Sequence, residues 1–115
     1  MVHRGFLLRL KPGAAQAYRA LHIQIPPPVE RAYDDAGILE ETIFEKDGLL
    51  FVHSVARDDA SLSRARDSEA GRNWALTMSE YLQEEVGGTG RSRELTLVYH
   101  HQASRAGRSD RMPRS

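Results

Sequence analysis

Two side chains that can move protons lie four residues apart in a stretch that is predicted to be helical. Tyr18 and His22 share one face of a helix over residues 14–25, because residues i and i+4 are neighbours on a helix. An imidazole titrates near neutral pH and a phenol can donate or accept a proton beside it. The pair therefore suits general acid–base catalysis, which contributes about 100- to 10,000-fold in rate. The alternative interpretation is that Tyr18 is a core aromatic and that His22 makes a structural hydrogen bond.

A second candidate for proton transfer lies in the middle of a predicted strand. His53 shares a strand face with the apolar Phe51 and Val55, so its imidazole must find a polar partner or face a cavity. We therefore treat His53 as a candidate catalytic residue beside His22 and Tyr18, with a structural role as the alternative. His100 and His101 point to opposite faces near the end of the last strand and are interpreted as surface histidines.

Two neighbouring glutamates and several aromatic side chains are candidates for substrate binding. Glu40 and Glu41 lie on opposite faces of their predicted strand, so one of them points toward the core or a pocket, where burial raises a carboxyl pKa. An edge position in water is the alternative. The residues predicted to bind a substrate are Trp74, Glu41, Phe51, Tyr99 and Met78. The histidines and carboxylates show no ligand spacing such as HExxH, so neither a metal site nor a cofactor is expected.

Composition limits the classes of protein that remain. A chain of 115 residues corresponds to about one domain. Its 16 basic and 16 acidic residues cancel, which argues against nucleic acid as a partner. There is no cysteine, and no apolar run approaches the roughly 20 residues that cross a membrane. The apolar stretch near the N-terminus is too short for a signal peptide, so we expect a cytoplasmic protein without membrane contact.

The elements that must position the candidate residues follow from periodicity and turn residues. Residues 2–10 are predicted to form a strand, and the helix over 14–25 is stopped by three prolines at 26–28. A second helix follows and is capped by Gly37. Two strands flank the Asp47-Gly48 loop, which is typical of a tight hairpin.

The second half of the chain is predicted to be mainly helical before it returns to the sheet. A short helix follows Asp58 and Asp59, one of which is expected to cap it, and Ser68 is expected to cap the next helix. Glycines at 87–90 break that helix, residues 94–101 form the last strand, and residues 102–115 are expected to be a flexible basic tail.

This order predicts one α+β domain over residues 1–101. The fold expected is a ferredoxin-like βαββαβ unit, a four-stranded antiparallel sheet with its helices on one face. The other sheet face would then expose apolar side chains to water, among them Phe51, Val55, Leu95 and Leu97. We therefore expect a homodimer that packs sheet against sheet about a two-fold axis.

The segment KPGAAQAYRALHIQIPPPVERAYDDAGILEETIFEKDGLLF resembles the L-rhamnose mutarotases, and RNWALTM is similar to their second motif. The resemblance extends from residue 4 to about residue 101. It implies a dimeric α+β barrel that interconverts sugar anomers without a cofactor, with His22 as the acid–base residue and Tyr18 beside it. The sequence departs from this family where Trp-Pro-Glu is replaced by Pro26-Pro27-Pro28, where paired tryptophans become Trp74-Ala75, and where a strand tyrosine is replaced near Glu41.

A shorter segment, LLFVHSVARDD, resembles the aromatic polyketide cyclases of the tetracenomycin type, whose strand histidine matches His53. The arginine-rich strand of those cyclases is absent. Because the departures from the mutarotases remove groups that stack on a sugar or bond its hydroxyls, they leave a more apolar pocket.

These observations lead to a first hypothesis and two alternatives. The first is a cofactor-free isomerase or cyclase that acts on an apolar, polyketide-like intermediate, of the kind met in antibiotic biosynthesis, with proton transfer by His22, His53 and Tyr18. The alternatives are a sugar mutarotase that uses His22 and Tyr18, and a small-molecule binding protein without catalysis. A cofactor-free monooxygenase on the same barrel also remains open.

Overall fold

The computed structural model describes residues 1–84 and 92–103. The elements, in chain order, are β1 (Val2–Arg9), α1 (Ala15–Ile23), α2 (Pro27–Ala36), β2 (Ile38–Lys46), β3 (Leu49–Ala56), α3 (Ser61–Asp67), α4 (Glu69–Ser79) and β4 (Ser92–Leu95). The predicted glycine break at 87–90 and the predicted tail from residue 104 lie outside the described residues.

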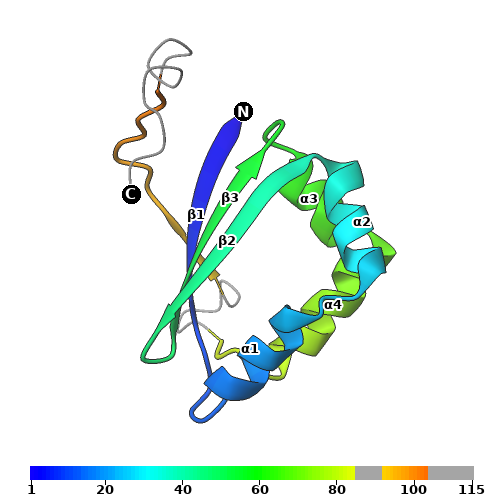
Figure 1. The fold of residues 1–115 in the computed structure, drawn as a ribbon, viewed down its shortest axis with the longest axis vertical. Coiled ribbons are helices and arrows are strands. Elements are labelled where there is room, and N and C mark those ends of the chain that lie inside the picture. Colours follow the sequence, from blue (N-terminus) through cyan, green and yellow to red (C-terminus); the bar gives the residue numbers. More distant parts are fainter. Residues whose placement is uncertain (85–91, 104–115) are drawn as a thin grey trace, which may run out of the picture.

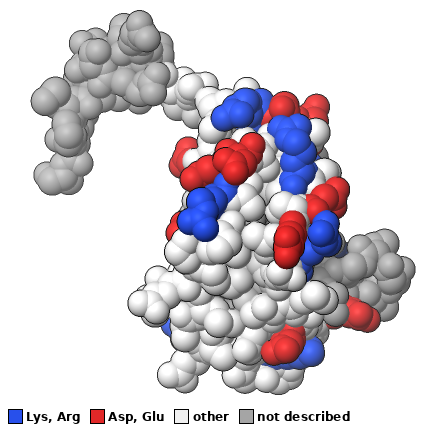
Figure 2. Space-filling model, turned by 90° about the vertical axis from the view of Figure 1, so that its right-hand side faces the viewer, with Lys and Arg blue, Asp and Glu red and all other residues white. Residues whose placement is uncertain are grey.

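The four strands form one sheet in the order β2-β3-β1-β4, and every neighbouring pair is antiparallel. All the labelled helices cover one face of this sheet (Figure 1), which confirms the predicted ferredoxin-like α+β fold. On the helical side, acidic and basic side chains lie next to one another rather than in areas of a single sign (Figure 2). None of the helices in the described ranges combines the length and the apolar character that a membrane span requires.

The tight turns form where the sequence predicts them. Pro27 begins α2, where the missing amide hydrogen of a proline costs nothing. Gly37 ends the same helix with a φ angle of 98°, in the left-handed region that favours glycine. Asp47 and Gly48 join β2 to β3 with φ angles of 52° and 83°, which confirms the two-residue hairpin loop.

The capping predictions are half correct. The Ser68 hydroxyl accepts a hydrogen bond from the Gly71 amide at 3.0 Å, as expected for the N-cap of α4. The prediction that Asp58 or Asp59 caps α3 is wrong, because the N-cap is Ala60. The Asp58 carboxylate accepts from the Ala60 amide at 2.9 Å and so closes the turn that precedes the helix.

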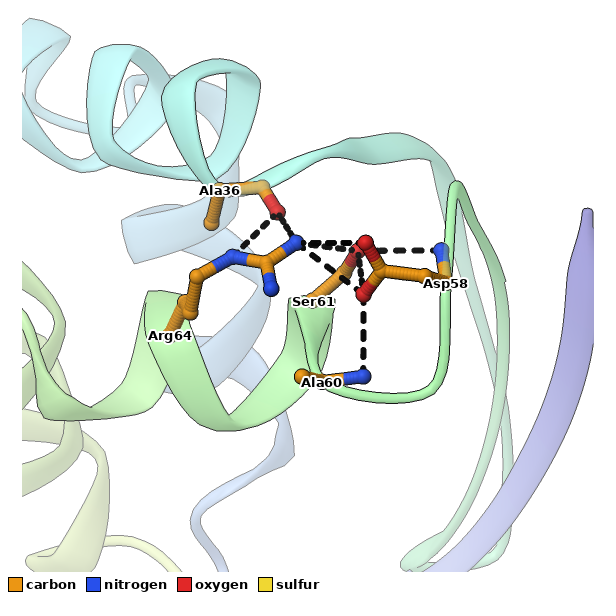
Figure 3. Close-up of polar contacts among 5 residues, drawn as sticks. All are labelled: Ala36, Asp58, Ala60, Ser61 and Arg64. Atoms are coloured by element: carbon orange, nitrogen blue, oxygen red, sulfur yellow. Dashed lines mark hydrogen bonds and ion pairs between the residues drawn. The ribbon is translucent and has the colours of Figure 1, made fainter.

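A hydrogen-bond network fixes α2 against α3 (Figure 3). The Arg64 guanidinium donates to the Ala36 carbonyl at 2.9 Å and to both Asp58 carboxylate oxygens at 3.0 Å. The Ser61 hydroxyl also donates to Asp58, at 3.1 Å. Because the Ala36 carbonyl belongs to the last turn of α2, this network satisfies a helix end and holds α2, which carries Tyr33, over the sheet.

The core lies between the sheet and the helices in two clusters. The larger is formed by Leu10, Tyr18, Leu50, Met78 and Leu82. It joins β1, α1, β3 and the C-terminal end of α4. The smaller is formed by Ala36, Ile38, Ala56 and Ala65, whose short side chains allow α2 and α3 to approach the sheet closely. Between the two clusters the space is not filled, and this is where the candidate site lies.

The outer face of the sheet differs in part from the prediction. Phe51 and Leu95 are each 42% exposed, as expected. The prediction that Val55 lies in water is wrong, because it is only 3% exposed. Val55 pairs with His3 in the register, and the His100 ring approaches the His3 ring at 3.9 Å, so the segment after β4 covers this end of the sheet.

The last strand is shorter than predicted. It ends at Leu95 rather than near residue 101, because β4 pairs with β1 only from Gly5 to Leu8. Beyond it the apolar side chains of Leu97, Val98 and Tyr99 are 60%, 92% and 77% exposed. The segment keeps the composition of a strand, but it does not pair with residues 2–4, which continue the same edge of β1.

Candidate active site

A cavity of about 380 Å³ lies between the helices and the inner face of the sheet. We call it the main cavity. Its apolar wall comes mostly from the strands and α4 and includes Phe6, Leu8, Ile43, Val52, Met78 and Leu82. Its polar or aromatic lining residues include Tyr18, His22, Tyr33, Glu41, Trp74 and Ser92. A mostly apolar pocket with a few convergent polar groups is the usual form of a small-molecule site.

The predicted pair of Tyr18 and His22 lines this cavity from α1. The two rings are 4.2 Å apart between centroids. Nδ1 of His22 lies 2.8 Å from the backbone carbonyl oxygen of Tyr18. A carbonyl oxygen only accepts, so Nδ1 carries the hydrogen and Nε2 of the neutral imidazole has the free lone pair. His22 is therefore held by its own helix in the tautomer that a base at Nε2 requires.

Trp74 and Met78 reach the cavity from α4, on the side that faces α1. The indole of Trp74 meets the His22 ring edge to face, with 5.4 Å between the centroids. Trp74 is half-buried and Met78 is buried in the larger core cluster. Trp74 thus forms part of the wall beside the imidazole, and an indole face is a common platform for sugar rings and cations.

Glu41 places a carboxylate in the cavity from the sheet side. Its Oε1 accepts a hydrogen bond from the Ser54 hydroxyl at 3.1 Å, and Ser54 itself has no exposed surface. Burial of the carboxyl group raises the pKa of Glu41, while the Ser54 bond and the nearby His22 act in the opposite direction. The residue still keeps surface open to the cavity, so the protein encloses the carboxylate only partly.

The neighbouring residue Glu40 does not line the main cavity. Glu40 pairs with Val55 in the register, and its charge acts on His3 at the outer face of the sheet. Of the two strand glutamates, it is therefore Glu41 whose side chain points inward.

Two tyrosine hydroxyls remain protonated in the cavity. Burial raises the pKa of Tyr18 to about 12, with a smaller contribution from the negative charge of Glu41. The pKa of Tyr33 is also raised by burial and by Glu41. Both phenols therefore act as hydrogen-bond donors at neutral pH. Tyr33 was not predicted as a site residue, although a hydroxyl on the apolar face of α2 is a signal that a polar partner or ligand lies opposite.

Three predicted site residues are not brought to the cavity. His53 lies on the outer face of β3, where its Nε2 is 3.1 Å from Nδ1 of His3. Phe51 lies on the same outer face, and Tyr99 follows β4 and is mostly exposed. The structure thus brings together His22, Tyr18, Glu41, Trp74 and Met78 and separates them from the other three. In the described parts of the chain, no group of three or more histidine or acidic side chains has the arrangement to hold a metal ion.

The fold and the cavity define an α+β domain with a mostly apolar cavity between helices and sheet, which is the usual form of a small-molecule site. The family model described as L-rhamnose mutarotase matches residues 3–101, and the chain belongs to that family. It is 27% identical over 97 residues to an L-rhamnose mutarotase of Acidiphilium cryptum, which covers 83% of this chain and 93% of the relative.

Solved structures show the same fold. An L-rhamnose mutarotase from Formosa agariphila superposes with a TM-score of 0.73 at 23% identity, over 89% of this chain and all of the other. Tetracenomycin F2 cyclase from Streptomyces glaucescens superposes with a TM-score of 0.62 at 20% identity, over 90% of this chain and all of the other.

The first hypothesis from the sequence is therefore wrong in its chemistry. The family match and the curated relatives indicate a mutarotase, whereas the likeness to the polyketide cyclase is one of fold alone. His53, the residue that carried the cyclase resemblance, lies outside the cavity. A cyclase, a polyketide substrate and a role in antibiotic biosynthesis are not supported, and the family is one of isomerases in the broad sense.

The polar lining of the main cavity shows why an apolar, polyketide-like substrate was wrongly preferred to a sugar. Two tryptophans, a carboxylate and a tyrosine of the family pattern are missing, so the pocket was predicted to be depleted in sugar-binding groups. In the folded chain Tyr33 of α2 adds a hydroxyl to the cavity beside the predicted Glu41. The contribution of Tyr33 depends on how α2 packs over the sheet, which short motifs do not reveal.

Proposed function

We propose that the protein is a sugar mutarotase that interconverts the α and β anomers of L-rhamnose or a closely related deoxy sugar. The observation that carries the proposal is the Tyr18–His22 pair at the wall of the main cavity, with the lone pair of His22 at Nε2. The family match supports the same reaction. The apolar wall suits the methyl group and the C–H face of a deoxy sugar, and Trp74 offers a ring on which that face can stack.

The reaction needs two proton transfers, and the pair can supply both. Nε2 of His22 accepts the proton of the anomeric hydroxyl while the bond between C1 and the ring oxygen breaks, and the Tyr18 hydroxyl gives its proton to the ring oxygen. The product is the open-chain aldehyde. After rotation about the C1–C2 bond the steps reverse, so the ring closes on the other face of C1 and both residues regain their starting protonation.

The test is polarimetry of freshly dissolved α-L-rhamnose with wild-type protein and three variants. His22→Ala is expected to lower kcat/KM by roughly 100-fold or more, and Tyr18→Phe by at least about 10-fold, because each removes one proton-transfer group. His53→Ala is the matched histidine control, since His53 lies on the other sheet face, and it is expected to retain wild-type activity. A His22→Ala variant as active as the wild type contradicts the proposed role of the pair.

We further propose that a second copy of the chain covers the outer face of the sheet. The exposed aromatic side chains of Phe44 and Phe51 and the apolar segment at Leu97, Val98 and Tyr99 support this proposal, because a monomer rarely exposes so much apolar surface in one region. An isologous pairing of two such faces buries them without any other partner.

A further inference from the structure

The proposed proton transfers give no role to Glu41, a carboxylate that lines the main cavity. The Glu41 carboxylate lies across from His22, on the sheet side, and is held by the buried Ser54 hydroxyl. The two ion pairs within the described residues join Arg4 to Glu94 and Arg64 to Asp58, so Glu41 has no ion-pair partner there. The carboxylate keeps surface open to the cavity, so a positively charged group of a ligand can reach it there.

A second cavity continues the site past Glu41, and its charged lining residues are also negative. It measures about 440 Å³ and shares with the main cavity His22, Tyr33, Ile38, Glu41, Ile43 and Trp74. Glu30 and Asp34, which are four residues apart on one face of α2, also line it, and so does Glu40 of β2. No lysine or arginine is among its described lining residues, and Arg66 lines only the main cavity.

The excess of acidic over basic side chains is confined to the second cavity and does not extend over the whole surface. The chain has equal numbers of basic and acidic residues, and they are interspersed over the helical side (Figure 2). A concave site lined by carboxylates concentrates negative potential, because its low-dielectric walls focus the field. Such a site attracts a cationic ligand and gives no comparable advantage to a neutral one.

We propose that Glu41 selects a deoxy sugar that carries a protonated amine, with Glu30 and Asp34 adding negative potential at the entrance. The inference rests on the proposed mutarotase function and names its substrate class. In this arrangement the ammonium group donates to the Glu41 carboxylate, and the methyl or deoxy carbons of the ring contact the apolar wall that includes Ile43 and Val52. The anomeric carbon then faces His22 and Tyr18, which are on the opposite side of the cavity from Glu41.

The experiment compares 6-deoxy-L-hexoses that carry a primary amine at C2, C3 or C4 with their N-acetyl forms and with L-rhamnose. Anomer exchange gives kcat/KM, and ligand-observed NMR gives the Kd. We expect at least one amine to exceed its neutral N-acetyl form by roughly tenfold in kcat/KM, because the ammonium group makes a charge-assisted hydrogen bond to Glu41 that the amide cannot make. This preference should weaken as salt is added, because screening reduces the attraction.

Substitutions of the three carboxylates test which of them causes the preference for an amine. Glu41→Gln keeps the size of the side chain and an acceptor for the Ser54 hydroxyl, and it should abolish most of the amine preference. The pair Glu30→Gln and Asp34→Asn should lower the same ratio by a smaller factor, because these side chains are exposed at the entrance. Thermal unfolding of each variant shows whether it is folded.

The outcomes separate this inference from the function on which it rests. If L-rhamnose is turned over and every amine reacts no faster than its N-acetyl form, the amine preference is overturned and the mutarotase function stands. If no sugar shows anomer exchange but an amine binds more tightly than its N-acetyl form and Glu41→Gln removes the difference, the mutarotase function fails and the charge selection stands. If neither exchange nor binding is seen, both are overturned.

Discussion

At the scale of single residues, the site depends on how two side chains are held. A helical hydrogen bond to the Tyr18 carbonyl sets the tautomer of His22, and the Ser54 hydroxyl orients Glu41. The spacing of Tyr18 and His22 was enough to predict that they share a helix face. That Glu41 rather than Glu40 points inward was not predictable, because the register of β2 shifts between Ile38 and Glu40. Such an irregularity reverses which side chains face the core.

Glu41 makes the stability of the protein depend on pH in a direction that can be measured. Its pKa is raised above the ordinary value of 4.5, so the folded state holds the proton more tightly than the unfolded state. Stability from this group is complete below pH 4.5 and is lost as the pH rises through the raised pKa. Glu41→Gln should therefore raise the melting temperature at neutral pH by no more than roughly 4 °C, given the open cavity, and should have little effect near pH 4.

Thermal unfolding of Glu41→Gln across this pH range is the measurement. Glu40→Gln is the control, because it removes one negative charge from the adjacent position, where the carboxylate acts on His3 and does not line the main cavity. An equal effect of both variants at every pH would show that the cavity does not penalise the Glu41 charge.

At the scale of elements, features set by a few adjacent residues were predicted well, whereas features set by packing between elements were not. The hairpin loop at Asp47 and Gly48, the glycine cap of α2 and the serine cap of α4 depend on a few adjacent residues, and the sequence contained them. The extent of β4 depends on a neighbouring strand edge, so its strand-like composition past Leu95 led to a prediction that was too long. Tyr33 was missed because its place in the site depends on how α2 packs over the sheet.

The glycine that ends α2 is required for two reasons. Gly37 has a φ angle of 98°, and a Cβ atom added there would lie 2.8 Å from the Ser61 hydroxyl oxygen. Gly13 also has a positive φ angle, 77°, but has no atom within 4 Å of such a Cβ. Gly13→Ala should therefore cost about 1 kcal/mol in unfolding free energy from backbone strain alone, and Gly37→Ala about 2–3 kcal/mol.

Denaturant unfolding of the two alanine variants measures this difference directly. A Gly37→Ala variant that is no less stable than Gly13→Ala would mean that α2 and α3 shift apart without cost, and that the Arg64 network does not fix their separation.

At the scale of the whole molecule, the proposed dimer accounts for the apolar surface that the helices leave uncovered. Phe51→Glu places a charge on the outer sheet face and is expected to give a monomer of 12.9 kDa, where the wild type has twice this mass. Leu76→Glu is the matched control, because Leu76 is 69% exposed on α4, on the helical side, and should not alter the mass. Light scattering coupled to size-exclusion chromatography measures the masses, and a monomeric wild type would contradict the proposed pairing.

The central claim is that the cavity beside Tyr18 and His22 catalyses anomer exchange of a sugar. Saturation transfer between the α and β anomeric protons of L-rhamnose at equilibrium measures that exchange directly. We predict that the exchange rate rises in proportion to the concentration of wild-type protein and that the same concentrations of His22→Ala leave it near the rate in buffer. A rate that is the same with wild-type protein, with His22→Ala and in buffer alone would contradict the claim.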